Sequence, residues 1–567
     1  MHSGKRVVDH LVKAVSALGV RHVFGVDGAN IEDLYDAAFD HRDLLTAVVA
    51  KHEFAAATMA DGYARSTSGL GVVCATSGGG AVNLVAGLAE SHASRVPVLA
   101  LVGQPPTVLE GKGAFQDSSG QAGSFDAVAL FTPISHYCAR VESPADLPAH
   151  LTHAAAAARR GGPAVLLLPK DIQQAELVAP DFVPPTHAYR RDIENLWRVL
   201  HIVRGARATG KVVIIAGDQV ARDDARAELA RFAAILDAAV GVAPDAKDVY
   251  HQADPGFCGV SGSMGNPELL DALRGAALCL LVGTRMPVTA RAGMEDALGA
   301  VPLASIGVMP PFLPARHAQS NDLAKTLAEL IGELGSTAGD PEREVIPLRP
   351  RAPHEPPLTS LSVPPSDGPG LRYREVVETI NAALPAGADV FADAGNTGAA
   401  VVHHLRLPRH GRFTVALGMG GMGYAFGAGI GSAFARHRRP DGSVRRTYVI
   451  AGDGAFFMHG MEIHTAIEHE LPITFIVFNN NAHAMCITRE QLYYGDRYSF
   501  NRFRPAYPGA GMAAMFPDLC AHAPESLAEL DAALRHCADR PGPSFVSVDC
   551  DPDEIPPFTP FLTPPRR

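Results

Sequence analysis

The chain lacks long apolar runs and carries few charges for its length. Of its 567 residues, 19% are charged, and the formal net charge is -11. An acidic surface repels phosphate backbones, so we expect no nucleic-acid partner. Apolar runs such as residues 164–169 and 278–283 fall far short of the roughly 20 residues that a membrane-spanning helix needs. We therefore expect no membrane span and interpret these runs as buried strands.

Paired cysteines and a secretory signal are also missing. The eight cysteines include no C-x-x-C pair, so the sequence suggests neither a zinc site nor a redox dithiol. The first twenty residues follow an amphipathic helical pattern with interspersed charges and lack the apolar centre of a signal peptide. These absences predict a cytoplasmic protein with free thiols.

Two proline-rich segments divide the chain. One hydrophobic core rarely serves 567 residues, so two or three domains are expected. The segment 346–370 is predicted to be a linker, because repeated prolines block the interiors of helices and sheets. Together with a weaker break after residue 180, it predicts domains at 1–180, 190–345 and 371–567.

Short apolar runs alternate with Ala-rich helical stretches in all three blocks. Examples of these runs are VLALVGQ, VVIIAGD, TYVIAGDG and ITFIVFNN. The alternation is typical of βαβ units, so the predicted fold is α/β, with three doubly wound parallel-sheet domains. Ligands bind such sheets at the carboxyl ends of the strands, which makes the residues after these runs candidate site residues.

The strongest local pattern lies in the third block. Asp453 stands between two glycines at the end of one apolar run, and Asn480 ends the next run. A right-handed crossover brings both strand ends to one edge of the sheet. One carboxylate and one amide oxygen suit Mg²⁺, and flanking glycines let a diphosphate approach the backbone. Alternatively, Asp453 caps a helix and the asparagines form an ordinary loop.

This GDG…NN pattern resembles the binding motif of thiamine-diphosphate enzymes. The resemblance implies that Asp453 and Asn480 provide the side-chain ligands of Mg²⁺ and that the Ala482 carbonyl is the third protein ligand. It also implies further contacts with the cofactor from the residues around the motif, namely Gly452, Gly454, Ala455 and Met485.

Residues 45–104 resemble the pyrimidine-binding domain of the acetolactate synthase group. By this resemblance Glu53 contacts the aminopyrimidine ring of the cofactor. A carboxyl group there favours the imino form, whose nitrogen removes the proton from the reactive carbon. Taken alone, Glu53 would be interpreted as a surface acid or an acid at a helix start, and its place in KHEFAAATMADGYAR reverses that interpretation. Asn83 matches the asparagine that the group places near the ring site.

Residues 416–431, ALGMGGMGYAFGAGIG, resemble the family segment that lies against the bend of the cofactor. The resemblance implies that Met422 is the apolar wedge between the two rings and that the Gly420 carbonyl accepts from the exocyclic amine. A glycine-rich helix packed on a sheet is the alternative. Asn396 and Thr397 follow another apolar run and are predicted to bond the diphosphate, although N-T-G is also ordinary turn chemistry.

The resemblance extends over nearly the whole chain and indicates the acetolactate synthase-like branch. It nominates Phe115 and Gln116 as residues that border the substrate. Arg489 stands where these synthases usually carry a tryptophan, and the single tryptophan is Trp197. A guanidinium group suits a carboxylate or phosphate, so we hypothesise an anionic acyl acceptor. A surface arginine is the alternative.

The predicted activity is that of a thiamine-diphosphate-dependent carboligase. It decarboxylates a 2-oxo acid, with pyruvate as the first candidate, and transfers the acyl carbanion equivalent to a carbonyl acceptor. A 2-oxo acid decarboxylase that releases an aldehyde is the alternative, and a noncatalytic family member is a third possibility. The resemblance names the three blocks the pyrimidine-binding, central and diphosphate-binding domains.

Two further expectations follow from the resemblance. Some relatives hold FAD in the central domain, but the segment ASIGVMPPF lacks the acid expected after that strand, so FAD is doubtful. Because Glu53 and Asp453 belong to different domains, the family pattern implies a homodimer or homotetramer with active sites at the interface.

Overall fold

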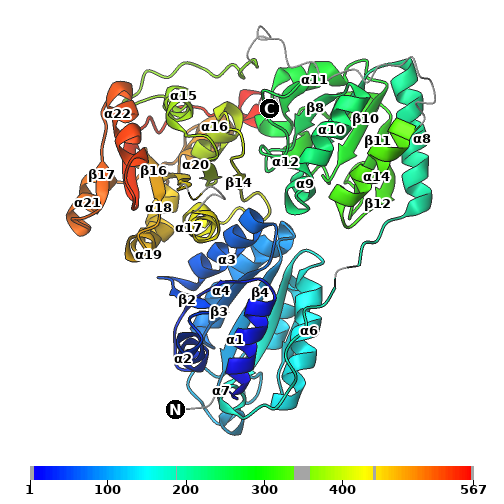
Figure 1. Cartoon of the computed structure of the whole chain (residues 1–567). Coiled ribbons are helices and arrows are strands. Elements are labelled where there is room, and N and C mark those ends of the chain that lie inside the picture. The colour runs from blue at the N-terminus through cyan, green and yellow to red at the C-terminus, as the bar shows by residue number, and fades with distance from the viewer. Residues whose placement is uncertain (1–4, 187, 337–357, 438–441, 443, 564–567) are drawn as a thin grey trace.

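The computed structural model describes residues 5–186, 188–336, 358–437, 442 and 444–563. It contains three six-stranded sheets, and the paired strands of each run parallel (Figure 1). The predicted fold of three α/β parallel-sheet domains is therefore confirmed. Part of the predicted linker, 346–357, lies outside the described residues, and 358–370 form neither helix nor strand.

The first domain has the strand order β2-β1-β3-β4-β6-β5. Every residue of β4 and β6 is buried, which explains why these strands read as unbroken apolar runs. The strands are β1 (His22–Val26), β2 (Thr46–Val49), β3 (Gly71–Ala75), β4 (Val98–Gln104), β5 (Tyr137–Arg140) and β6 (Pro163–Pro169). The helices are α1 (Val7–Ala17), α2 (Glu32–Asp40), α3 (Glu53–Thr67), α4 (Gly79–Ala93), η1 (Thr107–Leu109), α5 (Ala127–Phe131), η2 (Thr132–Ile134), η3 (Pro144–Asp146), α6 (Leu147–Ala158) and α7 (Lys170–Gln174).

The central domain has the strand order β12-β11-β10-β7-β8-β9. Its strands are β7 (Val212–Ala216), β8 (Ala239–Val242), β9 (Phe257–Val260), β10 (Leu278–Val282), β11 (Leu303–Gly307) and β12 (Arg316–Gln319). Its helices are α8 (Ile193–Thr209), α9 (Asp218–Arg222), α10 (Arg226–Leu236), η4 (Gly262–Met264), α11 (Pro267–Leu273), α12 (Val288–Arg291), α13 (Glu295–Ala300) and α14 (Leu323–Ser336).

The third domain has the strand order β14-β13-β15-β16-β18-β17, which repeats the topology of the first domain. Its strands are β13 (Asp389–Ala392), β14 (Phe413–Val415), β15 (Thr447–Gly452), β16 (Ile473–Asn479), β17 (Cys520–His522) and β18 (Ser544–Asp549). Its helices are α15 (Tyr373–Ala383), α16 (Asn396–His404), α17 (Tyr424–Arg436), α18 (Asp453–His459), η5 (Gly460–Glu462), α19 (Ile463–Glu468), α20 (Ala484–Tyr494), α21 (Pro508–Met515), α22 (Leu527–Ala538) and α23 (Thr559–Leu562).

Helices α3 and α17 pack the first and third domains together (Figure 1). A Cβ atom at Gly62 would lie only 2.0 Å from the Ala428 carbonyl oxygen, and one at Gly431 only 1.9 Å from the Met59 carbonyl oxygen. Any larger side chain at these glycines would therefore force the helices apart. Because each helix follows the second strand of its own sheet, equivalent positions of the two domains face each other.

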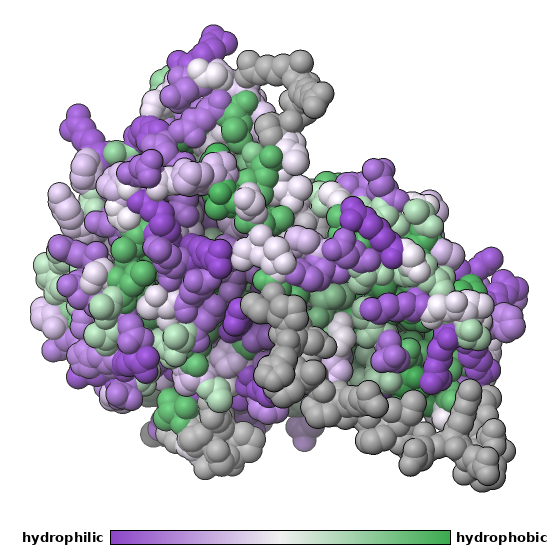
Figure 2. Space-filling model, turned by 90° about the horizontal axis from the view of Figure 1, so that it is seen from above, coloured by the Kyte–Doolittle hydropathy of each residue, from purple (hydrophilic) through white to green (hydrophobic). Residues whose placement is uncertain are grey.

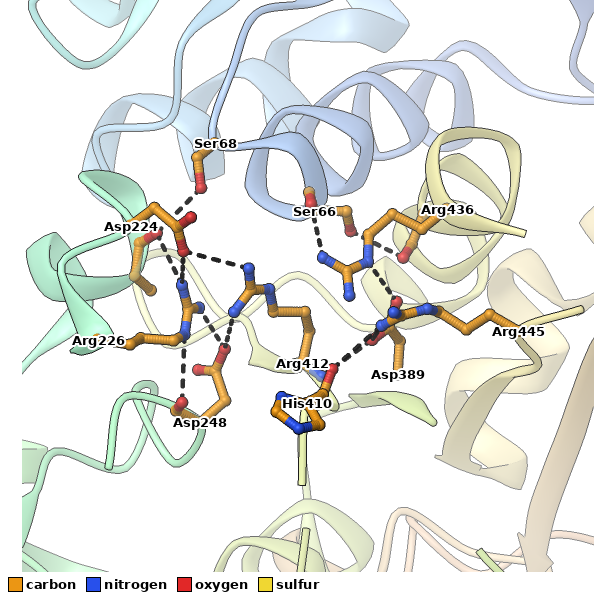
Figure 3. A network of polar contacts seen from close by, with 12 residues as sticks. Ser66, Ser68, Asp224, Arg226, Asp248, Asp389, His410, Arg412, Arg436 and Arg445 are labelled. Carbon is orange, nitrogen blue, oxygen red and sulfur yellow. Dashed lines mark hydrogen bonds and ion pairs between the residues drawn. The ribbon is translucent and has the colours of Figure 1, made fainter. Parts of the chain in front are cut away.

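A polar network joins all three domains. It includes two serines of the first domain, three charged residues of the central domain and five residues of the third, namely Ser66, Ser68, Asp224, Arg226, Asp248, Asp389, His410, Arg412, Arg436 and Arg445 (Figure 3). Arg412 reaches Asp224 at 3.2 Å across the boundary between the central and third domains. The fully buried Asp389 binds Arg436 at 2.9 Å and Arg445 at 3.3 Å. Paired charges thus hold the domain junction.

Within the described residues, none of the helices has the length and apolar character needed to cross a membrane. The face drawn in Figure 2 mixes hydrophilic residues with separate apolar patches.

Candidate active site

Asp453 lies at the carboxyl edge of the third sheet. It begins α18 directly after β15, and β15 pairs in parallel with β16, with Gly452 opposite Phe478. The Asp453 carboxylate accepts hydrogen bonds from the Gly454 amide at 3.0 Å and from the Ala482 amide at 3.1 Å. The two strand ends are therefore adjacent, and the acid connects them.

Asp453 is buried in an environment that would be stabilised by a nearby positive charge. Its side chain is buried, and burial raises the pKa of Asp453 to about 6 against the lowering effect of its backbone hydrogen bonds. No lysine or arginine among the described residues forms an ion pair with this carboxylate. A buried carboxylate without a counter-charge is costly, and a bound cation would remove that cost.

The asparagine of the same edge presents an unused acceptor. Asn480 donates from Nδ2 to the Tyr373 hydroxyl at 3.0 Å, while its buried Oδ1 has no hydrogen-bond partner in the described part of the chain. An unsatisfied buried acceptor costs about 1–3 kcal/mol. The Asn480 oxygen and the Asp453 carboxylate are ligands that Mg²⁺ prefers, so the residues present fit such an ion.

The backbone around Ala482 supports the same interpretation. Ala482 and Arg502 form an isolated antiparallel bridge. Its hydrogen bonds run from His483 N to the Asn501 carbonyl at 2.9 Å and from Phe503 N to the Asn481 carbonyl at 2.7 Å. The bridge therefore fixes the loop while leaving the Ala482 carbonyl out of its hydrogen bonds.

Three other predicted residues surround the GDG turn. A Cβ atom at Gly454 would lie 3.1 Å from the Met422 Cε atom, and one at Gly452 would lie 3.5 Å from the Thr397 hydroxyl. Asn396 begins α16 beside Thr397, and its buried Oδ1 also has no partner among the described residues. The structure thus gathers Met422, Thr397 and Asn396 near Asp453, as a diphosphate cradle would require.

The loop that carries Gly420 is anchored by the first domain. The buried Glu90 carboxylate of α4 accepts hydrogen bonds from the amides of Gly418 at 3.2 Å, Met419 at 2.6 Å and Gly420 at 3.2 Å. Sequence reasoning missed Glu90. Glu90 lies in an Ala-rich helical stretch, and nothing in that stretch indicates that its side chain faces another domain.

Asp393 was missed as well. This buried acid at the end of β13 accepts hydrogen bonds from the amides of Gly423 at 3.0 Å and Ala425 at 2.9 Å. It thereby fixes the first turn of α17, just after Met422. Asp393 directly follows an apolar run, and this position at a strand end could have marked it as a candidate site residue.

Glu53 begins α3, after β2 ends at Val49, and it is buried. His52 caps the helix, with its Nδ1 accepting from Phe54 N at 3.0 Å. The Glu53 carboxylate accepts from the Asn83 side-chain amide at 2.9 Å, so the structure brings these two predicted residues together.

The first turn of α3, where Glu53 lies, adjoins the loop that carries Gly420 and Gly421 in the same chain. A Cβ atom at Gly421 would lie 3.3 Å from the Phe54 ring. No contact recorded among the described residues joins Glu53 directly to Asp453.

Phe115, Gln116 and Arg489, which were predicted to border the substrate, are less buried than Glu53 and Asp453. Gln116 has a positive φ of 61° and accepts from the Thr76 hydroxyl at 3.2 Å, whereas the Phe115 side chain is 76% exposed. Arg489 is exposed on α20, with its guanidinium 5.9 Å from the Phe561 ring centre. Met485 lies one turn earlier on the same helix and is half-buried.

Comparison with known proteins identifies the class. Three sequence models of thiamine pyrophosphate enzymes match the chain: the N-terminal binding domain over residues 5–124, the central domain over 198–332 and the C-terminal binding domain over 393–548. Together they cover most of the chain, and each matches a different one of the three sheet domains. The chain belongs to the thiamine pyrophosphate enzyme family, and thiamine diphosphate is its cofactor.

Within that family the chain is similar to acetolactate synthase large subunits. It is 28% identical over 515 residues to a probable large subunit of Methanocaldococcus jannaschii. The aligned region covers 86% of this chain and 82% of the relative. The chain is 26% identical over 577 residues to a probable large subunit of Methanococcus aeolicus, covering 96% and 91%. A large subunit of Pyropia yezoensis is 25% identical over 582 residues, covering 98% and 93%. The predicted acetolactate synthase-like resemblance is thus confirmed.

Proposed function

We propose that the protein is an acetolactate synthase-like carboligase that takes pyruvate as its donor and uses Mg²⁺ to hold the cofactor. The observation that carries this proposal is the pair formed by the buried Asp453 carboxylate and the unpartnered Asn480 oxygen at adjacent strand ends. The similarity to acetolactate synthase large subunits supports the reaction class.

The residues at this edge of the third sheet would bind either the metal ion or the diphosphate. Asp453, Asn480 and the Ala482 carbonyl would hold Mg²⁺, while Thr397, Asn396 and the glycines of the GDG turn would receive the diphosphate. When bound, thiamine diphosphate supplies the carbanion chemistry that removes CO₂ from a 2-oxo acid and transfers the remaining acyl unit.

The first domain and the loops that follow it complete the site. Glu53, which accepts a hydrogen bond from Asn83 at 2.9 Å, would hold a proton beside the aminopyrimidine ring. Met422 would pack against the cofactor, and the Gly420 carbonyl would accept a hydrogen bond from its amine. Phe115, Gln116 and Arg489 would border the substrates. The exposed Arg489 forms no ion pair among the described residues, so its guanidinium could meet an anionic acceptor.

A homodimer or homotetramer completes the proposal. Glu53 and Asp453 make no recorded contact within the described residues, and the family pattern places such partners across a subunit boundary. We also propose a cytoplasmic location, since no disulfide joins any of the described cysteines.

Product analysis tests the reaction class. We expect the purified protein, supplied with thiamine diphosphate, Mg²⁺ and pyruvate, to form a hydroxy-ketone by joining two carbonyl compounds. Mass spectrometry of the products with a panel of neutral and anionic acceptors measures this. Release of the aldehyde alone would identify a decarboxylase instead.

The same panel tests the acceptor. Arg489→Ala is expected to lower the yield with anionic acceptors about tenfold or more while sparing neutral ones, since a charge-assisted hydrogen bond contributes about 1.5–3 kcal/mol. Arg502→Ala, which removes another exposed arginine, one paired with Asp553, is the matched control. An unchanged ratio between the two classes of acceptor would remove Arg489 from the pocket.

A further inference from the structure

A second group of metal-binding side chains lies at the outer edge of the third sheet. The edge strand β17 carries Cys520 and His522, and α22 carries Cys537. One ligand atom from each of these residues lies within 4.8 Å of the others. Figure 1 shows β17 and α22 together at the margin of the third domain, away from the first and central domains. This cluster is separate from the GDG edge described above.

The secondary structure accounts for the convergence. Cys520 and His522 are alternate residues of one strand, so their side chains leave the same face of the sheet. The His522 Nε2 atom and the Cys520 Sγ atom are 3.4 Å apart. The fully buried Cys537 approaches them from α22, which packs against the neighbouring strand β18.

These separations suit a soft metal ion. With metal–sulfur bonds of about 2.3 Å and metal–nitrogen bonds of about 2.0 Å, a tetrahedral zinc site separates its ligand atoms by roughly 3.5–3.8 Å. The observed sulfur–nitrogen distance of 3.4 Å already matches this value. Two thiols and one imidazole are also the ligands that thiophilic cations select over the oxygen ligands preferred by Mg²⁺.

A buried cation lies beside the cluster. The guanidinium of the buried Arg446 lies close enough to interact electrostatically with Cys520 and Cys537. Its hydrogen bonds go to neutral acceptors, the Thr474 hydroxyl at 3.1 Å and the Gly542 carbonyl at 3.1 Å among them. Burial nevertheless raises the pKa of Cys537, so a metal ion that binds there must displace the thiol proton.

We propose that Cys520, His522 and Cys537 bind one thiophilic divalent cation such as Zn²⁺, with water as the fourth ligand. The ion would tie the edge strand β17 to α22. This inference does not depend on the proposed carboligase activity, because the residues and the ligand chemistry of the two sites differ.

Cobalt(II) reports directly on thiolate ligation. Protein that is reduced and saturated with thiamine diphosphate and Mg²⁺ is titrated with Co²⁺, so that the oxygen-ligand site is already filled. We expect sulfur-to-cobalt charge-transfer absorption that saturates at one Co²⁺ per chain and disappears when Zn²⁺ is added in excess.

Variants locate the signal. Cys520→Ser and His522→Asn are each expected to weaken Co²⁺ binding at least tenfold, and Cys537→Ala to abolish the charge-transfer band. Cys138→Ser, which removes a half-buried thiol from β5, is the matched control and should leave the titration unchanged. Far-ultraviolet circular dichroism checks that each variant is folded.

Two results would overturn the proposal. One is the absence of a charge-transfer band in the unmodified, reduced protein. The other is an unchanged Co²⁺ affinity in the folded His522→Asn and Cys520→Ser variants, since the ligands would then lie elsewhere.

Discussion

At the scale of single residues, the site is defined by polar atoms that are buried without full compensation. Asp453 has no counter-charge, and the Oδ1 atoms of Asn480 and Asn396 have no partner within the described residues. Folding alone gives no reason to bury these groups, because each raises the free energy of the empty protein. A cation and a diphosphate would compensate them together.

Glu53 carries the prediction at this scale. Glu53→Gln keeps the size of the side chain and a hydrogen-bonding group for Asn83, but it removes the acid that acts on the cofactor. We expect the turnover number to fall about 10²–10⁴-fold, the range of general acid–base catalysis, with cofactor affinity changed far less. Steady-state kinetics measures this effect.

The exposed Glu32→Gln is the control and should leave turnover unchanged. Wild-type turnover in Glu53→Gln would show that this carboxyl takes no part in the reaction.

Sequence reasoning located the residues whose role follows from topology. Asp453 and Asn480 end neighbouring parallel strands, so their proximity could be foreseen. Glu90 could not, because its role depends on how α4 meets a loop of another domain. The same holds for Cys537, which no spacing rule connects to Cys520.

At the scale of elements, the apolar runs predicted the strands closely. The run VLALVGQ is β4 in its entirety, because a strand covered on both faces reads as one unbroken apolar stretch. Asp453 is the first residue of α18 and Gly452 occupies the N-cap position, so the alternative in which Asp453 caps this helix is wrong. The contact between α3 and α17 was not foreseen, because it depends on glycines whose neighbours lie in another domain.

The prediction at this scale concerns the loop that carries Gly420 and is held by Glu90. Glu90→Ala leaves the amides of Gly418, Met419 and Gly420 without their shared acceptor. The loop then loses its fixed place, and we expect thiamine diphosphate to bind about 10–100-fold more weakly, the range seen when residues that support metal ligands are removed. Cofactor titration with activity or fluorescence as the readout measures this.

Glu110→Ala is the matched control. It removes another buried glutamate, which pairs with Arg140 at 2.7 Å inside the first domain. Equal losses of cofactor affinity in both variants would indicate general destabilisation, and no loss in Glu90→Ala would show that the loop needs no anchor.

At the scale of the whole molecule, the three domains are joined by polar contacts as well as by packed helices. Lys247 of the central domain donates from its amine to the Val402 carbonyl on α16 of the third domain. Burial lowers the pKa of Lys247 to about 7. This contact lies on the helix that begins with Asn396, so it links the central domain to the cofactor cradle.

Lys247 predicts a pH dependence of stability. Between pH 7 and about pH 10 the unfolded chain holds a proton on this lysine that the folded protein releases, so stability rises with pH in this window. The contribution is at most about 1.4 kcal/mol per pH unit. Lys247→Met is expected to be more stable than the wild type at pH 7, with the difference shrinking toward pH 10.

Thermal unfolding of both proteins at several pH values measures this difference. The exposed Lys211→Met is the control and should show no such trend. A difference that stays constant with pH would mean that the Lys247 amine titrates normally.

The central claim is that Asp453 and Asn480 together hold a divalent ion and, through it, thiamine diphosphate. Isothermal titration calorimetry of the apoprotein with thiamine diphosphate in the presence of Mg²⁺ tests it most directly, with Asp453→Ala beside Asp531→Ala, a surface control on α22. The account predicts binding heat in the wild type and in the control, and a loss of affinity of at least 100-fold in Asp453→Ala. Undiminished binding by a folded Asp453→Ala variant would contradict the account.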